Sequence, residues 1–310
     1  MIDREATATA NPRRGIALML LGILMFSLND VLGKWLVSTY SVGQLLLFRS
    51  AAALVVLSPF VWRSGLKGIW QPERPGLQAA RVVFSTGELL LFYWSVVFLP
   101  LVDAMTYYLA APIYVAALSP LLLGERVGWR RWVAIAIGFG GVVIALQPSA
   151  ATLSPAALIP IAGSLAFALM LITGRQLKGV PDLGLVFWQT AGAFAAGLVT
   201  APFGWVNPGG RDLALLALLG IVSVGAHACV IRSLKLADAA TVSPFQYTLL
   251  LWAILFGYLV FGDVPKPAML AGAAIIIGAG LFIFYREIRA RSAEAAGPVL
   301  ARRGGQRVAS

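Results

Sequence analysis

Residues 103–145 read DAMTYYLAAPIYVAALSPLLLGERVGWRRWVAIAIGFGGVVIA, and residues 238–284 read DAATVSPFQYTLLLWAILFGYLVFGDVPKPAMLAGAAIIIGAGLFIF. Each stretch opens with Asp-Ala-x-Thr and continues as an apolar run that contains proline. The run ends at a Gly-acid pair, and a second apolar run follows it. The openings lie 135 positions apart, and the Gly-acid pairs (124–125 and 262–263) lie 138 apart. This match between the two halves of the chain indicates an internal repeat.

The composition excludes an ordinary soluble domain. Only 12% of the residues are charged, 59% are hydrophobic, and the mean hydropathy is +0.85. Apolar runs recur at about the 20-residue length that a helix needs to cross the bilayer. Apolar and polar residues do not alternate within these runs, which favours transmembrane helices over the strands of a β-barrel. We therefore predict an all-α polytopic membrane protein with ten transmembrane helices. The predicted spans are 15–37, 41–61, 79–99, 101–123, 129–147, 154–175, 183–203, 211–233, 237–261 and 266–285.

Five spans per half is an odd number, so the second copy must enter the membrane in the opposite direction. The predicted organisation is a cytoplasmic tail (1–14), two inverted five-helix repeats (15–147 and 152–287) and a disordered cytoplasmic tail (288–310). Twenty of the 24 Lys and Arg residues fall on the side of the N-terminus, which places both termini in the cytoplasm and the chain in the plasma (inner) membrane. The net charge of +11 then reflects topology and contact with anionic lipid, and we expect no nucleic-acid partner.

Inverted repeats are typical of secondary transporters, in which a solute binds between the halves near the midplane. Polar residues within the spans are therefore candidate site residues. Asp30 and Arg49 lie about 10 and about 12 Å from the outer end of their spans, so they can meet. We expect Asp30 or Glu88 to neutralise Arg49, either as a structural clamp or beside an anionic group of the solute. Glu88, the acid nearest the midplane, is the candidate for proton coupling or for meeting a cationic substrate; a structural pair with Arg49 is the alternative.

The remaining candidates surround prolines at similar places in the two repeats, Pro112 and Pro244, where freed backbone carbonyls favour a cavity wall or a hinge. The tyrosines suit an aromatic solute, although packing explains them as well. His227, the single histidine, is either a residue of the bundle whose hydrogen bonds are satisfied or a residue that lines the cavity. Cys229 points away from it on the same helix, so we predict no metal site. The predicted cavity residues are Asn29, Glu88, Tyr107, Tyr108, Tyr114, Ser164, His227, Ser243, Gln246 and Tyr247, and the predicted charge-pair or coupling set is Asp30, Arg49 and Glu88.

The chain resembles the EamA-type, ten-helix branch of the drug/metabolite transporter superfamily over roughly 15–287. The resemblance rests on FRSAAA (48–53), LPLVDA (99–104), GERVGWRRW (124–132), GFGGVVIA (138–145) and SPFQYTLLLWAILFGYLVFGDVP (243–265). It implies two inverted five-helix repeats around a central cavity lined chiefly by spans 1, 3, 4, 6, 8 and 9. Members carry amino acids, S-adenosylmethionine, riboflavin, nucleosides, polyamines or drugs, and the first repeat is similar to the S-adenosylmethionine and riboflavin uptake members. Asp263 stands where a Glu is commoner.

The favoured hypothesis is a secondary transporter that moves a small organic metabolite, similar to riboflavin or S-adenosylmethionine, across the inner membrane by alternating access. An exporter of amino acids or drugs is the alternative within transport. A lipid flippase or a non-transporting membrane scaffold is the alternative from another class. One His and one Cys in the whole chain argue against an enzyme. The expected partners are a small-molecule solute, membrane lipids and a coupling proton, with no cofactor, and the expected assembly is a monomer or a homodimer.

Overall fold

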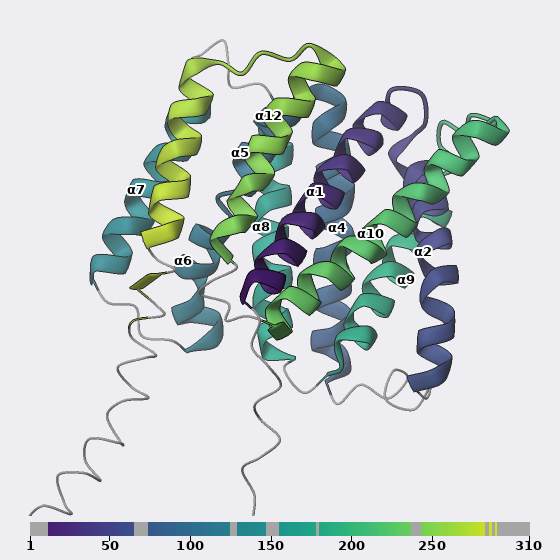
Figure 1. The fold of residues 1–310 in the computed structure, drawn as a ribbon, viewed down its shortest axis with the longest axis horizontal. Helices are drawn as coiled ribbons and strands as arrows, with labels where there is room; N and C mark the ends of the chain where they lie inside the picture. Colours follow the sequence, from purple (N-terminus) through teal and green to yellow (C-terminus); the bar gives the residue numbers. More distant parts are fainter. Residues whose placement is uncertain are drawn as a thin grey trace, which may run out of the picture.

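The computed structural model describes residues 12–64, 74–124, 129–146, 155–177, 180–236 and 243–282, together with 285, 286 and 289. These residues form helices packed side by side in one bundle and no β-strand (Figure 1). The first half contains α1 (Pro12–Val37), α2 (Val42–Ser64), α4 (Pro75–Phe98), α5 (Leu101–Tyr108), α6 (Ala111–Leu123) and α7 (Trp129–Leu146). The second half contains α8 (Pro155–Gln176), α9 (Asp182–Thr200), α10 (Gly210–Leu236), the 3-10 helix η1 (Ser243–Tyr247), α12 (Thr248–Phe261) and a last helix, Pro267–Phe282, which carries no label in Figure 1.

The helices account for all ten predicted spans. In the described residues, 7 helical segments are long and apolar enough to cross a membrane, and three shorter apolar helices correspond to the fifth, ninth and tenth spans. Large apolar side chains also cover the outside of the bundle: Trp62 is 83% exposed, Leu121 81% and Val55 71%. A surface of this kind is unfavourable in water and is solvated by lipid. The prediction of an all-α polytopic membrane protein is confirmed.

The fourth span of each repeat is interrupted near its beginning. In the first repeat the interruption is the turn between α5 and α6 at Leu109 and Ala110, just before Pro112. In the second repeat it is η1, which contains Pro244 and leads into α12. The longer pieces, α6 and α12, have 13 and 14 residues. Both end at a glycine in the left-handed region, because Gly124 has φ 68° and Gly262 has φ 69°. The Gly-acid pairs of the sequence repeat are therefore matching helix ends.

The packing of the helices follows an internal two-fold relation between the repeats. The most extensive contacts join α1 to α10, α2 to α9 and α4 to α8. Exchanging each helix for its counterpart in the other repeat converts the α1–α10 pair into α8–α4 and returns the α2–α9 pair to itself. The contacts of α6 with α8 and of α12 with α1 are related in the same way. The interface between the repeats is thus formed mainly by α1, α2, α4, α8, α9 and α10, with further contacts from α5, α6 and α12.

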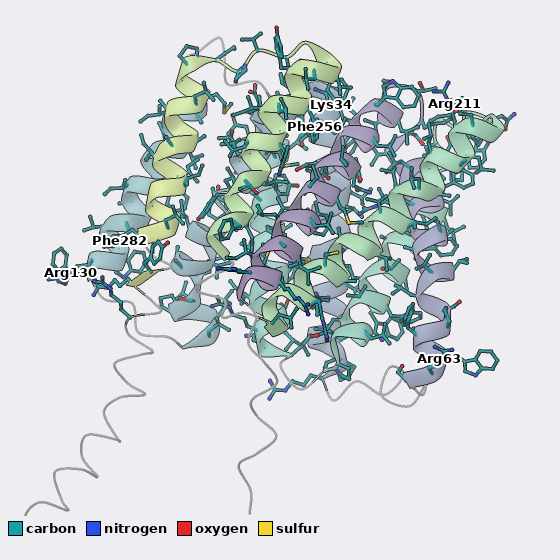
Figure 2. The ribbon with its side chains drawn as sticks, in the orientation of Figure 1. Lys34, Arg63, Arg130, Arg211, Phe256 and Phe282 are labelled. Atoms are coloured by element: carbon teal, nitrogen blue, oxygen red, sulfur yellow. The ribbon has the colours of Figure 1, made fainter. Side chains whose placement is uncertain are left out.

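The two ends of the bundle are identified by labelled residues in Figure 2. Lys34, at the end of α1, lies at the upper end, and Arg63, near the end of α2, lies at the lower end. We call these the Lys34 end and the Arg63 end. The helix α1 begins at the Arg63 end, where Ser233 of α10 donates to the carbonyl of Gly15 over 2.6 Å. The helix α8 finishes at that same end, where Gln176 donates to the carbonyl of Leu122 over 2.8 Å. The corresponding helices of the two repeats therefore run in opposite directions, as predicted.

Close approach of α2 and α10 depends on Gly220. A Cβ atom at this position would overlap the backbone carbonyl oxygen of Arg49 and lie 2.9 Å from the backbone nitrogen of Ala53. The neighbours are backbone atoms, which cannot rotate away, so the helices would have to separate.

We predict that Gly220→Ala lowers the free energy of unfolding by about 2 kcal/mol, the scale of overpacking in a close-packed interior. Thermal unfolding in detergent measures the change. Gly278→Ala is the matched control, because a Cβ there meets no atom within 4 Å and alanine favours the helix. Equal midpoints for the two variants would contradict the close packing of α2 on α10.

Candidate functional site

A buried polar cluster lies where α1, α2, α4 and α10 meet. Arg49 donates from Nη2 to the hydroxyl of Ser223 over 2.9 Å, and its guanidinium carbon lies 5.6 Å from the centre of the Tyr93 ring. Tyr93 in turn donates to the Asn29 side-chain oxygen over 3.4 Å, and the Asn29 amide donates to the carbonyl of Leu219 over 2.6 Å. Asn29 is 2% exposed and Arg49 9% exposed. The two repeats are therefore joined through polar side chains in the middle of an apolar bundle.

Arg49 is not neutralised by a direct ion pair. Among the described residues, neither Asp30 nor Glu88 has a carboxylate oxygen within 4.0 Å of its guanidinium group, which corrects the expectation from the sequence. The reason is geometric: Arg49 extends toward Ser223 and the Tyr93 ring instead. Arg49, Asp30 and Glu88 nevertheless lie in one region of the interior. A guanidinium with only a hydroxyl and a ring as close partners retains donors for an anionic group.

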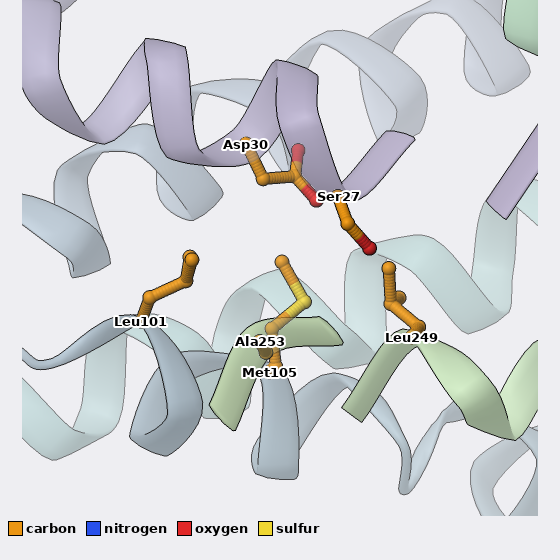
Figure 3. A pocket seen from close by; sticks show the side chains of 6 residues that line it. All are labelled: Ser27, Asp30, Leu101, Met105, Leu249 and Ala253. Atoms are coloured by element: carbon orange, nitrogen blue, oxygen red, sulfur yellow. The ribbon is translucent and has the colours of Figure 1, made fainter. Parts of the chain in front are cut away.

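Asp30 faces a small pocket between the repeats. Figure 3 shows the side chains of Asp30 and Ser27, on α1, pointing toward α5 and α12. The pocket is lined by Ser27, Asp30, Leu101, Met105, Leu249 and Ala253, and it leaves no room for a water-sized sphere. Ser27 is 2% exposed, and its hydroxyl has no hydrogen-bond partner among the described residues. The pocket between the repeats is therefore closed in this structure.

Glu88 and His227 lie on the helices that form this cluster, α4 and α10. The backbone carbonyl of Glu88 accepts a hydrogen bond from the Tyr108 hydroxyl over 3.2 Å. Phe92 lies between two of the tyrosine rings, with its centre 5.2 Å from that of Tyr93 and 5.4 Å from that of Tyr108. His227 Nδ1 is 2.8 Å from the carbonyl oxygen of Ser223, and its ring packs edge-on against Phe26 at 4.8 Å. The cluster thus combines charges with a row of aromatic rings.

The other predicted cavity residues lie apart from this cluster. Tyr114 is buried in the apolar core, and the Ser164 hydroxyl donates to the carbonyl of Ile161 within its own helix over 2.9 Å. Tyr107 is buried in the apolar core, and the Tyr247 hydroxyl packs on Gly280 of the last helix. Gln246 is exposed, and the side chain of Ser243 lies outside the described residues. The predicted residues that the structure brings together are Asn29, Asp30, Arg49, Glu88, Tyr108 and His227.

Sequence reasoning missed Tyr93 and Ser223, which hold Arg49 in place. Tyr93 lies five positions after Glu88, and Ser223 lies one helical turn before His227. Ser223 and His227 are four positions apart, so helical spacing places them on the same face of α10. No pattern in the sequence indicates that the Tyr93 ring turns toward α2.

Polar contacts between the repeats close the Lys34 end. Lys34 pairs with Asp263, with 2.7 Å between Nζ and Oδ2, and Nζ also lies 4.4 Å from the centre of the Phe261 ring. Tyr40 donates to the carboxylate of Asp212 over 2.7 Å. This hydrogen bond raises the pKa of the Tyr40 phenol above its ordinary value. The bond is thus fully present at neutral pH and is lost only as the pH rises through that raised pKa.

The Arg63 end is closed in a similar way. The contacts of Ser233 with Gly15 and of Gln176 with Leu122 both join a helix of one repeat to a helix of the other. Arg81 of α4 adds a third contact, because its Nη1 donates to the carbonyl of Leu185 of α9 over 3.2 Å. Both ends of the interior are therefore bridged by hydrogen bonds or ion pairs that must break for that end to open.

In the part of the chain that the structure describes, no group of three or more His, Cys, Asp or Glu side chains is arranged to hold a metal ion. The chemistry available is that of hydrogen bonds, charges and aromatic rings. Such a site recognises an organic molecule by its shape and charge.

This arrangement, a membrane bundle of two inverted repeats with a closed polar site between them, is that of a carrier. The model of the EamA-like transporter family matches the chain twice, over residues 13–147 and 154–285, so the chain belongs to this family and its two-repeat architecture is confirmed. One solved crystal structure shares the fold with a TM-score of 0.60 at 18% identity, over 86% of this chain and 94% of that chain.

Curated relatives match along nearly the whole chain. The S-adenosylmethionine uptake transporter of Rickettsia felis is 28% identical over 279 residues, covering 90% of this chain and 95% of the relative. The riboflavin transporter of Rhizobium johnstonii is 30% identical over 297 residues, covering 93% and 98%. The riboflavin transporter of Vibrio cholerae is 26% identical over 292 residues, covering 90% and 95%.

Proposed function

We propose that this protein is a secondary transporter that takes up a small organic metabolite across the inner membrane by alternating access of its two repeats. One observation carries the proposal: the buried polar cluster of Arg49 and Asn29 lies between the repeats, and polar contacts join the repeats at both ends of the bundle. Alternating access requires a central site that neither side reaches in the closed state. The relatives named S-adenosylmethionine uptake transporter and riboflavin transporter support the same class of function.

The side chains of the cluster favour a zwitterionic solute that carries an aromatic ring. Arg49 offers donors to a carboxylate, and Asp30 and Glu88 offer acceptors to a cationic group. The rings of Tyr93, Phe92 and Tyr108 pack edge-on against one another in the closed structure, and we propose that they present a face for stacking when the site opens. An S-adenosylmethionine-like solute uses all three features, whereas a riboflavin-like solute uses chiefly the aromatic row. Glu88 and Asp30 are also the proposed proton carriers, since either carboxyl can exchange a proton as the two ends open in turn.

The distribution of Lys and Arg supports the orientation. With the N-terminus in the cytoplasm, the Arg63 end faces the cytoplasm and the Lys34 end faces outward. We propose that the ion pair of Lys34 and Asp263 is the closing contact of the outward end and that the solute enters when it breaks.

Charge reversal tests this closing contact. Lys34→Glu places two like charges face to face and should slow solute exchange about tenfold, because the closed outward end then forms less often. Adding Asp263→Lys reverses the pair and should restore at least half of the exchange rate. Lys266→Glu is the control, because this exposed lysine at the same end forms no ion pair with a described residue. Slow exchange in the double variant would argue against the pair as the closing contact.

Counterflow in proteoliposomes tests the proposed function itself. Vesicles preloaded with S-adenosylmethionine, riboflavin, nucleosides or aromatic amino acids would be diluted into a trace of the labelled solute. The proposal predicts transient accumulation with at least one zwitterionic, ring-bearing solute. Absence of accumulation across the panel, from protein shown to be folded by its unfolding curve, would contradict the metabolite transporter and shift the assignment to a lipid or drug carrier.

A further inference from the structure

A second buried polar site lies near the Arg63 end, away from the Arg49 cluster. Gln78 and Arg81 are three positions apart on α4, so they share a face of the helix. Gln78 is 4% exposed and Arg81 9% exposed. Both amide atoms of Gln78 and the Nε atom of Arg81 are without a hydrogen-bond partner among the described residues. Two adjacent polar side chains thus bury donors that the surrounding protein does not satisfy.

The remaining nitrogens of Arg81 are only weakly engaged. Nη1 donates to the carbonyl of Leu185 over 3.2 Å, and Nη2 reaches the side-chain oxygen of Gln189 at 3.5 Å, the outer limit of a hydrogen bond. No carboxylate of the described residues lies within 4.0 Å of the guanidinium group. On the third side lies Gly174 of α8, where a Cβ atom would stand 3.5 Å from Nε. The site is therefore formed by α4, α8 and α9.

An arrangement of this kind is costly unless a ligand uses it. A buried charge without an opposite charge beside it and buried amide atoms without hydrogen bonds both destabilise a folded protein. An oxyanion supplies what these atoms lack, since it accepts charge-assisted hydrogen bonds from a guanidinium and from a side-chain amide. A cation or an apolar group satisfies neither Arg81 nor the donor of Gln78.

The internal two-fold relates this site to the Arg49 cluster. Arg49 is the eighth residue of α2, and Gln189 is the eighth residue of α9, so the two occupy corresponding positions. Arg49 crosses from α2 to α10, and Arg81 crosses between the counterparts of these helices, from α4 to α9. Each of these two matching helix pairs thus has one arginine.

We infer that Gln78 and Arg81 form a second binding site for an oxyanion, a carboxylate or phosphate group, at the Arg63 end of the interior. The inference rests on the proposed function, because the group reaches the site when that end opens. The same chemistry is found in a soluble solute with a carboxylate and in the phosphate of an anionic lipid headgroup. In either case the oxyanion lies between Gln78, Arg81 Nε and Gly174.

Thermal unfolding in lipid nanodiscs tests the site without requiring transport. In phosphatidylcholine discs at constant ionic strength, inorganic phosphate and acetate should each raise the unfolding midpoint of the wild-type protein in a saturable way. Gln78→Leu should raise the midpoint in the absence of anion, since an apolar side chain replaces unsatisfied amide atoms. The same substitution should weaken the apparent affinity for the anion about tenfold. Arg81→Gln should abolish the saturable response.

Two further variants separate binding from structure. Gly174→Ala adds a methyl group at ordinary contact distance from Nε, so it should fold normally and weaken the anion response. Arg63→Gln changes an exposed arginine at the same end and should leave the response unchanged. If Arg81→Gln lowers the midpoint but keeps the wild-type anion response, Arg81 only fastens α4 to α9 and the inference is overturned.

A third arm distinguishes the source of the oxyanion. If discs that contain phosphatidylglycerol already show the raised midpoint and added phosphate has no further effect, the ligand is the lipid headgroup. If the response to phosphate and acetate is the same in both kinds of disc, the ligand is a soluble anion. No saturable response in either disc overturns the site, and counterflow by the same protein then shows that the proposed transport function stands independently.

Discussion

Substitution of Arg49 by lysine should weaken binding of the transported solute ten- to hundredfold while the protein keeps its fold. Lysine preserves the positive charge but is a single ammonium group, so it cannot donate to the Ser223 hydroxyl and also present two parallel donors to a carboxylate of the solute. The expected loss corresponds to one charge-assisted hydrogen bond to the solute, about 1.5–3 kcal/mol. The measurement is titration of the purified protein in nanodiscs with the solute that gives counterflow.

Two comparisons make the Arg49 result interpretable. Arg63→Lys, at an exposed position near the end of α2, should bind as the wild type does. Arg49→Met removes the charge. If Arg49 is a structural clamp between helices, this substitution lowers the unfolding midpoint in the absence of solute. Unchanged binding by Arg49→Lys, or normal binding with a large loss of stability in Arg49→Met, would place Arg49 outside the solute site.

Fixing the outward end in its closed arrangement should stop exchange almost completely. The Lys34–Asp263 pair joins residues from the two repeats, so a covalent link between these positions prevents the outward end from opening. Cysteines at positions 34 and 263, in a chain whose native Cys229 is replaced by alanine, would be joined by a short bis-methanethiosulfonate reagent. Exchange should fall at least tenfold, the step expected when one of two required states is removed, and a reductant should restore it.

Matched cysteine pairs control for the chemistry of the link. Ser38→Cys with Ser41→Cys carries the same reagent at the same end but within one repeat, so exchange should continue. Each single-cysteine variant should also remain active after treatment. Exchange at the wild-type rate in a protein whose 34–263 link is complete by mass spectrometry would show that the outward end need not open at this contact.

The sequence predicted the membrane architecture closely because each of its signals is local or repeated. Apolar runs give the spans directly, and the Gly-acid pairs mark the matching ends of α6 and α12, where Gly124 and Gly262 adopt positive φ. Pro112 and Pro244 likewise indicated the interrupted fourth spans, since a proline cannot continue the hydrogen-bonding pattern of a helix. These features depend on residues that are close together in the chain.

The candidate site was only partly predictable, because its geometry depends on side chains from distant helices. Intramembrane polarity singled out Asn29, Asp30, Arg49, Glu88 and His227, and the structure brings these five to one region. The direct ion pair expected for Arg49 was wrong, because the direction of a long side chain follows the local packing.

The positions that packing alone determines were missed for the same reason. The sequence does not indicate that Arg49 turns to Ser223 rather than to an acid, or that Arg81 is buried against α9. Both outcomes follow from the crossing of helices more than one hundred positions apart in the chain. Spacing within one helix identifies a polar face, but it does not determine which helix that face meets.

The central claim is that the pocket beside Asp30 becomes accessible from one side of the membrane at a time. Ser27→Cys, in the chain without Cys229, places a near-isosteric thiol in this pocket. A membrane-impermeant thiol reagent would be applied to right-side-out and to inside-out vesicles, with and without solute. We predict modification from both sides, slowed by solute, and loss of modification from the outside when positions 34 and 263 are linked. Modification from one side only, or equal outside modification in the linked protein, would contradict alternating access at this pocket.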